Sequence, residues 1–140
     1  MERKRLKKRG KQSPYFNHLN MVYEQAEEGF ARVSMKIKPH HKNIRGVVHG
    51  GAIASLADQA AMRAVHTRLT QGQTGRTIQM DMHYLAPARG KRLVGEGRVQ
   101  KIGRRIAFSD AEVKDDEGST IATARCTIML VEERENNEET

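Results

Sequence analysis

The sequence predicts an α+β fold in which one curved antiparallel sheet wraps around a single long, buried helix. The first indication is a helical stretch of about 19 residues within residues 43–69, whose apolar side chains recur at the i, i+3, i+4 spacing of one face. The second is a set of alternating apolar and polar segments, two before this helix and four after it. Tight turns between consecutive segments favour antiparallel pairing.

The elements follow in a simple order. Residues 14–19 are expected to form a short helix or turn, and residues 19–37 a hairpin that turns near Glu27, Glu28 and Gly29. After the long helix, we expect a strand over 77–85, with Ile78, Met80, Met82 and Tyr84 on one face. Pro87 and Gly90 mark the next turn, and three further strands are expected over residues 92–102, 104–114 and 119–131. Gly95 and Gly97 share a face, which leaves room for a close neighbour.

The long helix carries one carboxylate in otherwise apolar surroundings. Asp58 is the only acidic residue between Glu28 and Asp81. A carboxylate on a buried helix is costly unless it has partners. Asp58 therefore either marks the solvent-facing edge of the helix, or bonds a loop, or serves a function. Arg63 is a second departure from small residues and is expected to face solvent or to pair across subunits.

The start of the helix is a second candidate feature. His49, Gly50 and Gly51 precede it, so unpaired backbone N–H groups face an approach without side chains. This end of a helix carries partial positive charge and suits an anion or a developing oxyanion.

These residues together resemble a known family. Asn43, His49-Gly50-Gly51 and Asp58 form the pattern N-x5-HGG-x6-D, which is similar to the signature of PaaI-type acyl-CoA thioesterases of the hotdog superfamily. The resemblance runs from about residue 16 to 131 and includes TIQMDMHYLAPARG, KIGRR and ATARCTIML. It implies the hotdog fold, an acyl-CoA substrate, and a homo-oligomer, a dimer or a dimer of dimers, with active sites at the subunit interface.

The resemblance also implies roles for individual residues. Asp58 would act as general base or as nucleophile, alternatives that the sequence leaves open, and the Gly50 N–H would polarise the thioester carbonyl. Asn43 and His49 would orient water and thioester. Gly50 and Asp58 lie ~12 Å apart on one helix, which favours a site shared between subunits. The expected substrate-binding residues are Gly51, Thr77, Lys91, Arg92, Gly103, Arg104 and Arg105.

Each of these roles has a plainer interpretation. His49 can be a loop histidine satisfied by backbone, Thr77 an ordinary strand threonine, and the charged turns merely solvated. Paired arginines nevertheless suit phosphate geometry.

The net charge of +8 is unevenly distributed. Residues 1–12 form a basic arm of net +6, residues 132–140 an acidic tail of net −4, and the predicted domain over 13–131 carries +6. That domain charge would attract a phosphorylated carrier such as coenzyme A. The arm lacks interleaved aromatic residues, so no specific nucleic-acid partner is expected.

Composition excludes other classes. Cys126 is the only cysteine, so no intrachain disulfide forms, and a cytoplasmic location is expected. No apolar run approaches a membrane span. Neither metal-ligand spacing nor a phosphate-binding glycine motif occurs, so we expect no metal and no cofactor beyond the substrate's coenzyme A.

The acyl group is expected to be aromatic or of medium chain length. The alternatives are a non-catalytic acyl-CoA sensor and a hydratase; a hydratase would need a different acid–base pair, and no clear one is present.

Overall fold

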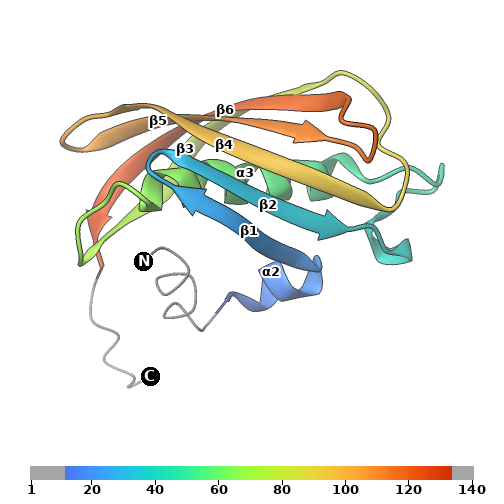
Figure 1. Ribbon diagram of the computed structural model, residues 1–140, viewed down its shortest axis with the longest axis horizontal. Coiled ribbons are helices and arrows are strands. Elements are labelled where there is room, and N and C mark those ends of the chain that lie inside the picture. Colours follow the sequence, from blue (N-terminus) through green and yellow to red (C-terminus); the bar gives the residue numbers. More distant parts are fainter. Residues whose placement is uncertain (1–11, 134–140) are drawn as a thin grey trace.

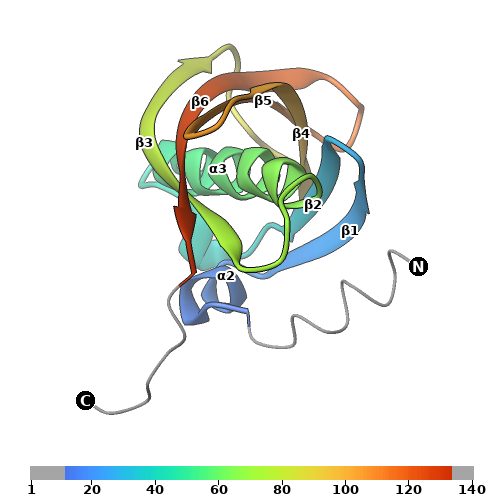
Figure 2. The ribbon, with the colours of Figure 1, turned by 90° about the vertical axis from the view of Figure 1, so that its left-hand side faces the viewer.

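The computed structural model describes residues 12–133, and their fold is the predicted α+β arrangement (Figure 1). The elements in chain order are α2 (Pro14–His18), β1 (Met21–Glu27), β2 (Phe30–Lys36), the 3-10 turn η1 (Pro39–His41), α3 (Gly50–His66), β3 (Gln73–Tyr84), β4 (Arg92–Ile102), β5 (Ile106–Lys114) and β6 (Thr120–Glu132). In a second view, the sheet curves around α3, and α2 lies on the side of the helix that the sheet leaves open (Figure 2). The predicted arm over 1–12 and tail over 132–140 lie almost wholly outside the described residues.

The strands form one six-stranded antiparallel sheet in the order β1-β2-β4-β5-β6-β3. The expected tight turns join β1 to β2, β4 to β5 and β5 to β6. The turn marked by Pro87 and Gly90 is not a hairpin, because β3 pairs with β6 at the sheet edge and β4 pairs with β2 and β5 in the middle. Strand β3 therefore forms an edge beside the open flank of α3.

Two glycines let α3 lie directly on the sheet. A Cβ atom at Gly97 would overlap the carbonyl of Ala60, and one at Gly95 would lie 3.1 Å from Leu56 Cγ. Leu56, Ala60 and their apolar neighbours on α3 are fully buried. This close contact confirms the expectation from the spacing of the two glycines.

A β-bulge changes which side chains of β3 face the helix. The pairing with β6 shifts between Thr77 and Gln79. The residues opposite buried positions of β6 are Thr77, Met80, Met82 and Tyr84, whereas Ile78 is exposed. The prediction that Ile78 shares the inward face is wrong, because the extra residue of the bulge reverses the alternation at that point.

Arg63 does not face solvent, so the first of the two expectations for it is wrong, and its pairing across subunits stays a prediction. Its side chain is buried, and its guanidinium lies over the Tyr23 ring, 4.9 Å from the centroid. A planar cation over an aromatic face keeps favourable electrostatics where water is excluded.

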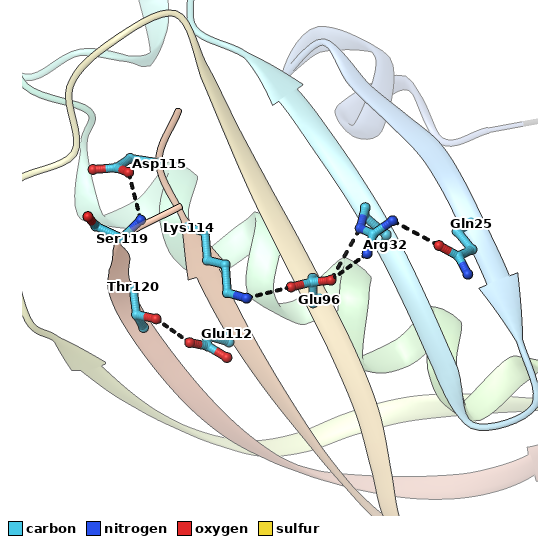
Figure 3. A network of polar contacts seen from close by, with 8 residues as sticks. All are labelled: Gln25, Arg32, Glu96, Glu112, Lys114, Asp115, Ser119 and Thr120. Atoms are coloured by element: carbon cyan, nitrogen blue, oxygen red, sulfur yellow. Dashed lines mark hydrogen bonds and ion pairs between the residues drawn. The ribbon is translucent and has the colours of Figure 1, made fainter. Parts of the chain in front are cut away.

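The outer face of the sheet carries a network of charged groups (Figure 3). Glu96 on β4 pairs with Arg32 on β2 at 2.8 Å and with Lys114 on β5 at 2.9 Å. Burial alone would raise the pKa of Glu96, but the hydrogen bonds and charges of Lys114 and Arg32 lower it below its ordinary value. These ion pairs join three neighbouring strands.

Candidate active site

Asp58 and Thr77 lie together at the seam between α3 and β3. The Thr77 hydroxyl donates to Asp58 Oδ1 at 2.7 Å, and both side chains are half-buried. The hydrogen bond exists because the bulge turns Thr77 inward. Asp58 is therefore neither fully solvated nor bonded to a loop backbone, and one of its oxygens is held by a neutral donor.

The His49 side chain caps the start of α3. Its Nδ1 accepts the Gly51 N–H at 2.8 Å, and its extended backbone is that of an N-cap residue. Because Nδ1 is an acceptor here, the proton of the neutral ring lies on Nε2. The His49 ring thus combines a structural role with an exposed donor.

The Gly50 N–H is the unpaired donor at this helix end. No acceptor within residues 12–133 takes it. The carbonyl of the same residue accepts the Tyr84 hydroxyl at 3.0 Å. A free N–H at the positive end of a helix is suited to stabilising negative charge on an oxygen.

Asn43 organises the loop that leads to this end. Its Oδ1 accepts the Arg45 N–H at 2.9 Å, and its backbone N–H donates to the Val47 carbonyl at 2.9 Å. Gly46 closes the turn with a φ of 81°. In this conformation the Asn43 carbonyl and its side-chain oxygen both hold the loop, since the carbonyl accepts the Gly46 N–H at 3.0 Å.

His41 attaches the same loop to the protein interior. Its ring is buried, its Nδ1 accepts the Lys38 N–H at 2.9 Å, and its carbonyl accepts the His49 N–H at 2.7 Å. Burial lowers the pKa of His41, and the neighbouring His40 lowers it further. A neutral His41 therefore supports the N-cap residue.

The predicted cationic residues form two separate groups. Lys91 and Arg92 begin β4, and Gly103, Arg104 and Arg105 lie at its other end, roughly 33 Å away at 3.3 Å per residue. Arg92 pairs with Glu24 at 2.8 Å and lines an open pocket of about 480 Å³ on the outer face of the sheet. One chain does not bring both groups to one ligand.

Asp58 and Gly50 lie two turns apart on α3, so one chain also keeps these two groups apart.

Cys126 lies on the inner face of β6 near Asp58. Burial, reinforced by the charge of Asp58, raises the pKa of the Cys126 thiol to about 12, so it stays protonated and unreactive.

The described part of the chain lacks both a metal-binding cluster and a membrane-spanning helix. Residues 12–133 contain no group of three or more His, Cys, Asp or Glu placed to hold a metal ion. Among the same residues, no helix has both the length and the apolar character needed to cross a membrane.

The sequence pattern missed Tyr84 as a site residue and His49 as a helix cap. Tyr84 was identified only as an apolar position on a strand, because no local signal shows that β3 ends beside the start of α3. The capping role had a signal, since a side-chain acceptor directly before a helix is typical of an N-cap.

Comparison with known proteins identifies the family. Residues 45–122 match the model of the thioesterase superfamily. A protein of Archaeoglobus fulgidus, provisionally named as an esterase, is 33% identical over 124 residues, 88% of this chain and 79% of that protein. The medium/long-chain acyl-CoA thioesterase YigI of Escherichia coli is 30% identical over 132 residues, covering 84% of this chain and 85% of its own.

The solved structures include the PaaI protein of the Escherichia coli phenylacetic acid degradation operon. It has a TM-score of 0.81 and 23% identity, and the match covers 89% of each chain, which supports a shared fold. The chain belongs to the thioesterase superfamily, its named relatives include an acyl-CoA thioesterase, and it has the hotdog fold that the family resemblance implied.

Proposed function

We propose that this protein hydrolyses acyl-CoA thioesters at a site built from two copies of the chain. Asp58 of one subunit faces the loop of residues 43–51 of the other. The observation that carries the proposal is the half-buried Asp58 carboxylate, bonded to Thr77 on an edge strand of the sheet. On the same helix, ~12 Å away, the Gly50 N–H lacks an acceptor in residues 12–133.

In this mechanism the Gly50 N–H binds the thioester oxygen and stabilises the charge that develops there. Asp58 either removes a proton from the attacking water or attacks the carbonyl carbon itself. When water attacks, the new carbon–oxygen bond replaces the carbon–sulfur bond, and coenzyme A leaves as a thiolate that takes up the proton removed from the water. When Asp58 attacks, the thiolate leaves as a mixed anhydride forms. Water then hydrolyses this anhydride, which releases the carboxylic acid, restores the Asp58 carboxylate and supplies the proton that the thiolate takes up. Asn43 and the Nε2–H of His49 orient the water and the thioester.

The open edge of the sheet supports the shared site. Strand β3 exposes Ile78 and Tyr84, and Leu85 follows them directly. An edge strand with unpaired backbone groups and apolar side chains is suited to pairing with a second copy. We therefore expect a dimer or a dimer of dimers.

The seam beside Asp58 favours an aliphatic acyl group over an aromatic one. Met62 lies one turn after Asp58, and Met80 and Met82 follow Thr77 on the inward face of β3. Flexible methionine side chains adapt to a flexible chain. The name of YigI, a medium/long-chain acyl-CoA thioesterase, agrees with this preference.

The nucleotide part of coenzyme A is assigned to the cationic turns, with Gly51 and Thr77 nearer the thioester. Lys91 and Arg92 lie at one end of β4 and residues 103–105 at the other. One bound coenzyme A contacts both groups only if they come from different subunits. The single cysteine, Cys126, agrees with a cytoplasmic location.

The test is thiol release from a panel of aryl- and acyl-CoA esters by the wild-type protein and by Asp58→Asn. We expect wild-type turnover and a loss of at least about 10²-fold in kcat for the variant, because an amide neither takes a proton nor attacks. Asp81→Asn on the exposed face of β3 is the matched control and should stay active. Unchanged turnover in Asp58→Asn would remove Asp58 from the chemistry. Tight binding without turnover by the wild-type protein would instead identify a sensor.

A further inference from the structure

We infer that Tyr84 is a positioning residue that holds the Gly50 amide in its reactive orientation. The inference rests on the proposed function, in which this amide polarises the thioester carbonyl. Tyr84 ends β3, and its hydroxyl donates to the Gly50 carbonyl at 3.0 Å.

The Tyr84 ring also packs against the Gly50 backbone. A Cβ atom built at Gly50 would lie 3.4 Å from both Cε1 and Cζ of Tyr84. The ring therefore lies within ordinary van der Waals distance of the position that a Gly50 side chain would begin from. Both the ring and the hydroxyl of Tyr84 limit how this residue can move.

The backbone at this point needs such support. Gly50 and Gly51 are consecutive residues without side chains, and glycine has more conformational freedom than any other residue. The peptide between them is held at both ends, since Tyr84 donates to its carbonyl and His49 Nδ1 accepts its N–H at 2.8 Å. With this peptide fixed, the orientation of the preceding one, which carries the Gly50 N–H, is restricted as well.

The preceding peptide is restrained from its other side by the helix. The His49 carbonyl accepts the N–H groups of Ala52 at 3.0 Å and Ile53 at 3.2 Å. The His49 carbonyl, the Gly50 carbonyl and the Gly51 N–H are therefore all engaged, while the Gly50 N–H has no acceptor within residues 12–133. The arrangement leaves one oriented donor for a ligand.

The same hydrogen bonds connect Tyr84 to His49. The chain runs from the Tyr84 O–H to the Gly50 carbonyl, and from the Gly51 N–H to His49 Nδ1. Consecutive hydrogen bonds through one peptide polarise one another. Loss of the first bond thus loosens both the Gly50 amide and the His49 ring.

A plainer role for Tyr84 would be an apolar contact at the exposed edge of the sheet, since 52% of the residue is accessible. That role requires the ring and not the hydroxyl. Tyr84→Phe keeps the ring and removes only the donor, so it separates the two roles.

The experiment measures kcat and KM of Tyr84→Phe with the best ester of the panel. We expect kcat to fall about two- to ten-fold, the equivalent of one net hydrogen bond, with KM unchanged. Tyr15→Phe is the matched control, because Tyr15 is similarly exposed and its hydroxyl lies 2.7 Å from Ser55 Oγ, which in turn donates to the Gly51 carbonyl. This variant removes a hydroxyl close to the same helix end without removing the donor to the Gly50 carbonyl. This control should retain wild-type kcat.

A second readout follows the backbone directly. In the NMR spectrum of the ligand-free protein, Tyr84→Phe should shift the Gly50 carbonyl carbon, whose hydrogen bond it removes, and Tyr15→Phe should leave this carbon unshifted. Size-exclusion chromatography should show the same oligomer for both variants and the wild type.

Several outcomes would overturn the inference. Wild-type kcat in Tyr84→Phe, a change confined to KM, or an equal loss in Tyr15→Phe would each do so. Failure of the proposed function is distinct, because it shows as a wild-type protein that releases no thiol from any ester of the panel.

Discussion

At the scale of single residues, the carboxylate of Asp58 is the feature on which the proposed chemistry depends. A carboxylate half-buried on an apolar helix needs a donor, and Thr77 supplies one to Oδ1. The second oxygen, Oδ2, receives no hydrogen bond from residues 12–133. The hydroxyl of Thr77 therefore orients the carboxylate and leaves one oxygen available to a proton or to a carbonyl carbon.

This arrangement predicts the effect of removing the Thr77 hydroxyl. Thr77→Val keeps the shape of the side chain but leaves Asp58 without its donor. We expect kcat to fall about ten- to a hundred-fold, because a hydrogen bond to a charged group is worth roughly 1.5–3 kcal/mol. Thr77→Ser retains the hydroxyl and should stay close to wild-type kcat. The measurement is thiol release at saturating substrate. Equal activities of the two variants would contradict the orienting role.

At the scale of elements, strand β3 connects the two halves of the site. Thr77 and Tyr84 are an odd number of residues apart, so a regular strand would place them on opposite faces. The bulge at Ile78 adds one residue and brings both to the inward face, where Thr77 meets Asp58 and Tyr84 meets Gly50. The single bulge in β3 thus places Thr77 beside Asp58 and Tyr84 beside Gly50.

The outer face of the sheet predicts a pH dependence of stability. The pKa of Glu96 is held below its ordinary value of 4.5 by Lys114 and Arg32, which outweigh its burial. The contribution of the ionised Glu96 carboxylate to the free energy of unfolding is therefore complete above pH 4.5. It is lost as the pH falls through the lower pKa of the folded state. Because both cations are a third or more exposed, we expect Glu96→Gln to reduce the free energy of unfolding by only about 1 kcal/mol at pH 7.

Denaturant unfolding over a pH series measures this effect. The difference between wild type and Glu96→Gln should shrink as the pH falls below 4.5, because the wild-type carboxyl then becomes protonated too. Glu117→Gln, in the exposed turn between β5 and β6, is the control and should match the wild type throughout. A constant difference at every pH would show that the ion pairs do not cause it.

At the scale of the whole molecule, the two reactive groups cannot meet within one chain. Gly50 and Asp58 are separated by ~12 Å along a rigid helix, and β3 beside them is an open edge. A second copy placed along that edge would bring its own Gly50 to this Asp58. Symmetry would then create two equivalent sites.

Subunit complementation tests this arrangement. Gly50→Pro removes the N–H, and proline suits the first helical position after His49, whose φ of −60° and ψ of 136° fit a residue before proline. Gly50→Pro and Asp58→Asn should each be inactive alone. A co-expressed mixture should recover roughly a quarter of wild-type activity, because random pairing gives half heterodimers with one intact site each.

The control for complementation is each variant mixed with itself under the same conditions, which should recover nothing. A mixture as inactive as its components would contradict a shared site and would place both groups in one chain's pocket. Analytical ultracentrifugation of the mixture should confirm that the variants form the same oligomer as the wild type.

Much of the candidate site could be predicted from local sequence patterns. The helix, the placement of Asp58 on its apolar length, and the glycines before it follow from spacing over a few residues, because helix periodicity and terminal backbone donors are local properties. Likewise, the inward-facing glycines of β4 were visible from a two-residue period. The sequence alone thus determined the long helix, the strands around it, the glycines at the start of α3 and Asp58 two turns further along.

Only the tertiary structure decided which of these residues meet. The pairing of β3 with β6, the bulge at Ile78, and the resulting contacts of Thr77 and Tyr84 with α3 depend on packing between segments far apart in the chain. One extra residue reverses the alternation of a strand without leaving a distinct mark in its composition. The burial of Arg63 against Tyr23 was also set by this packing, because these two residues lie far apart in the chain.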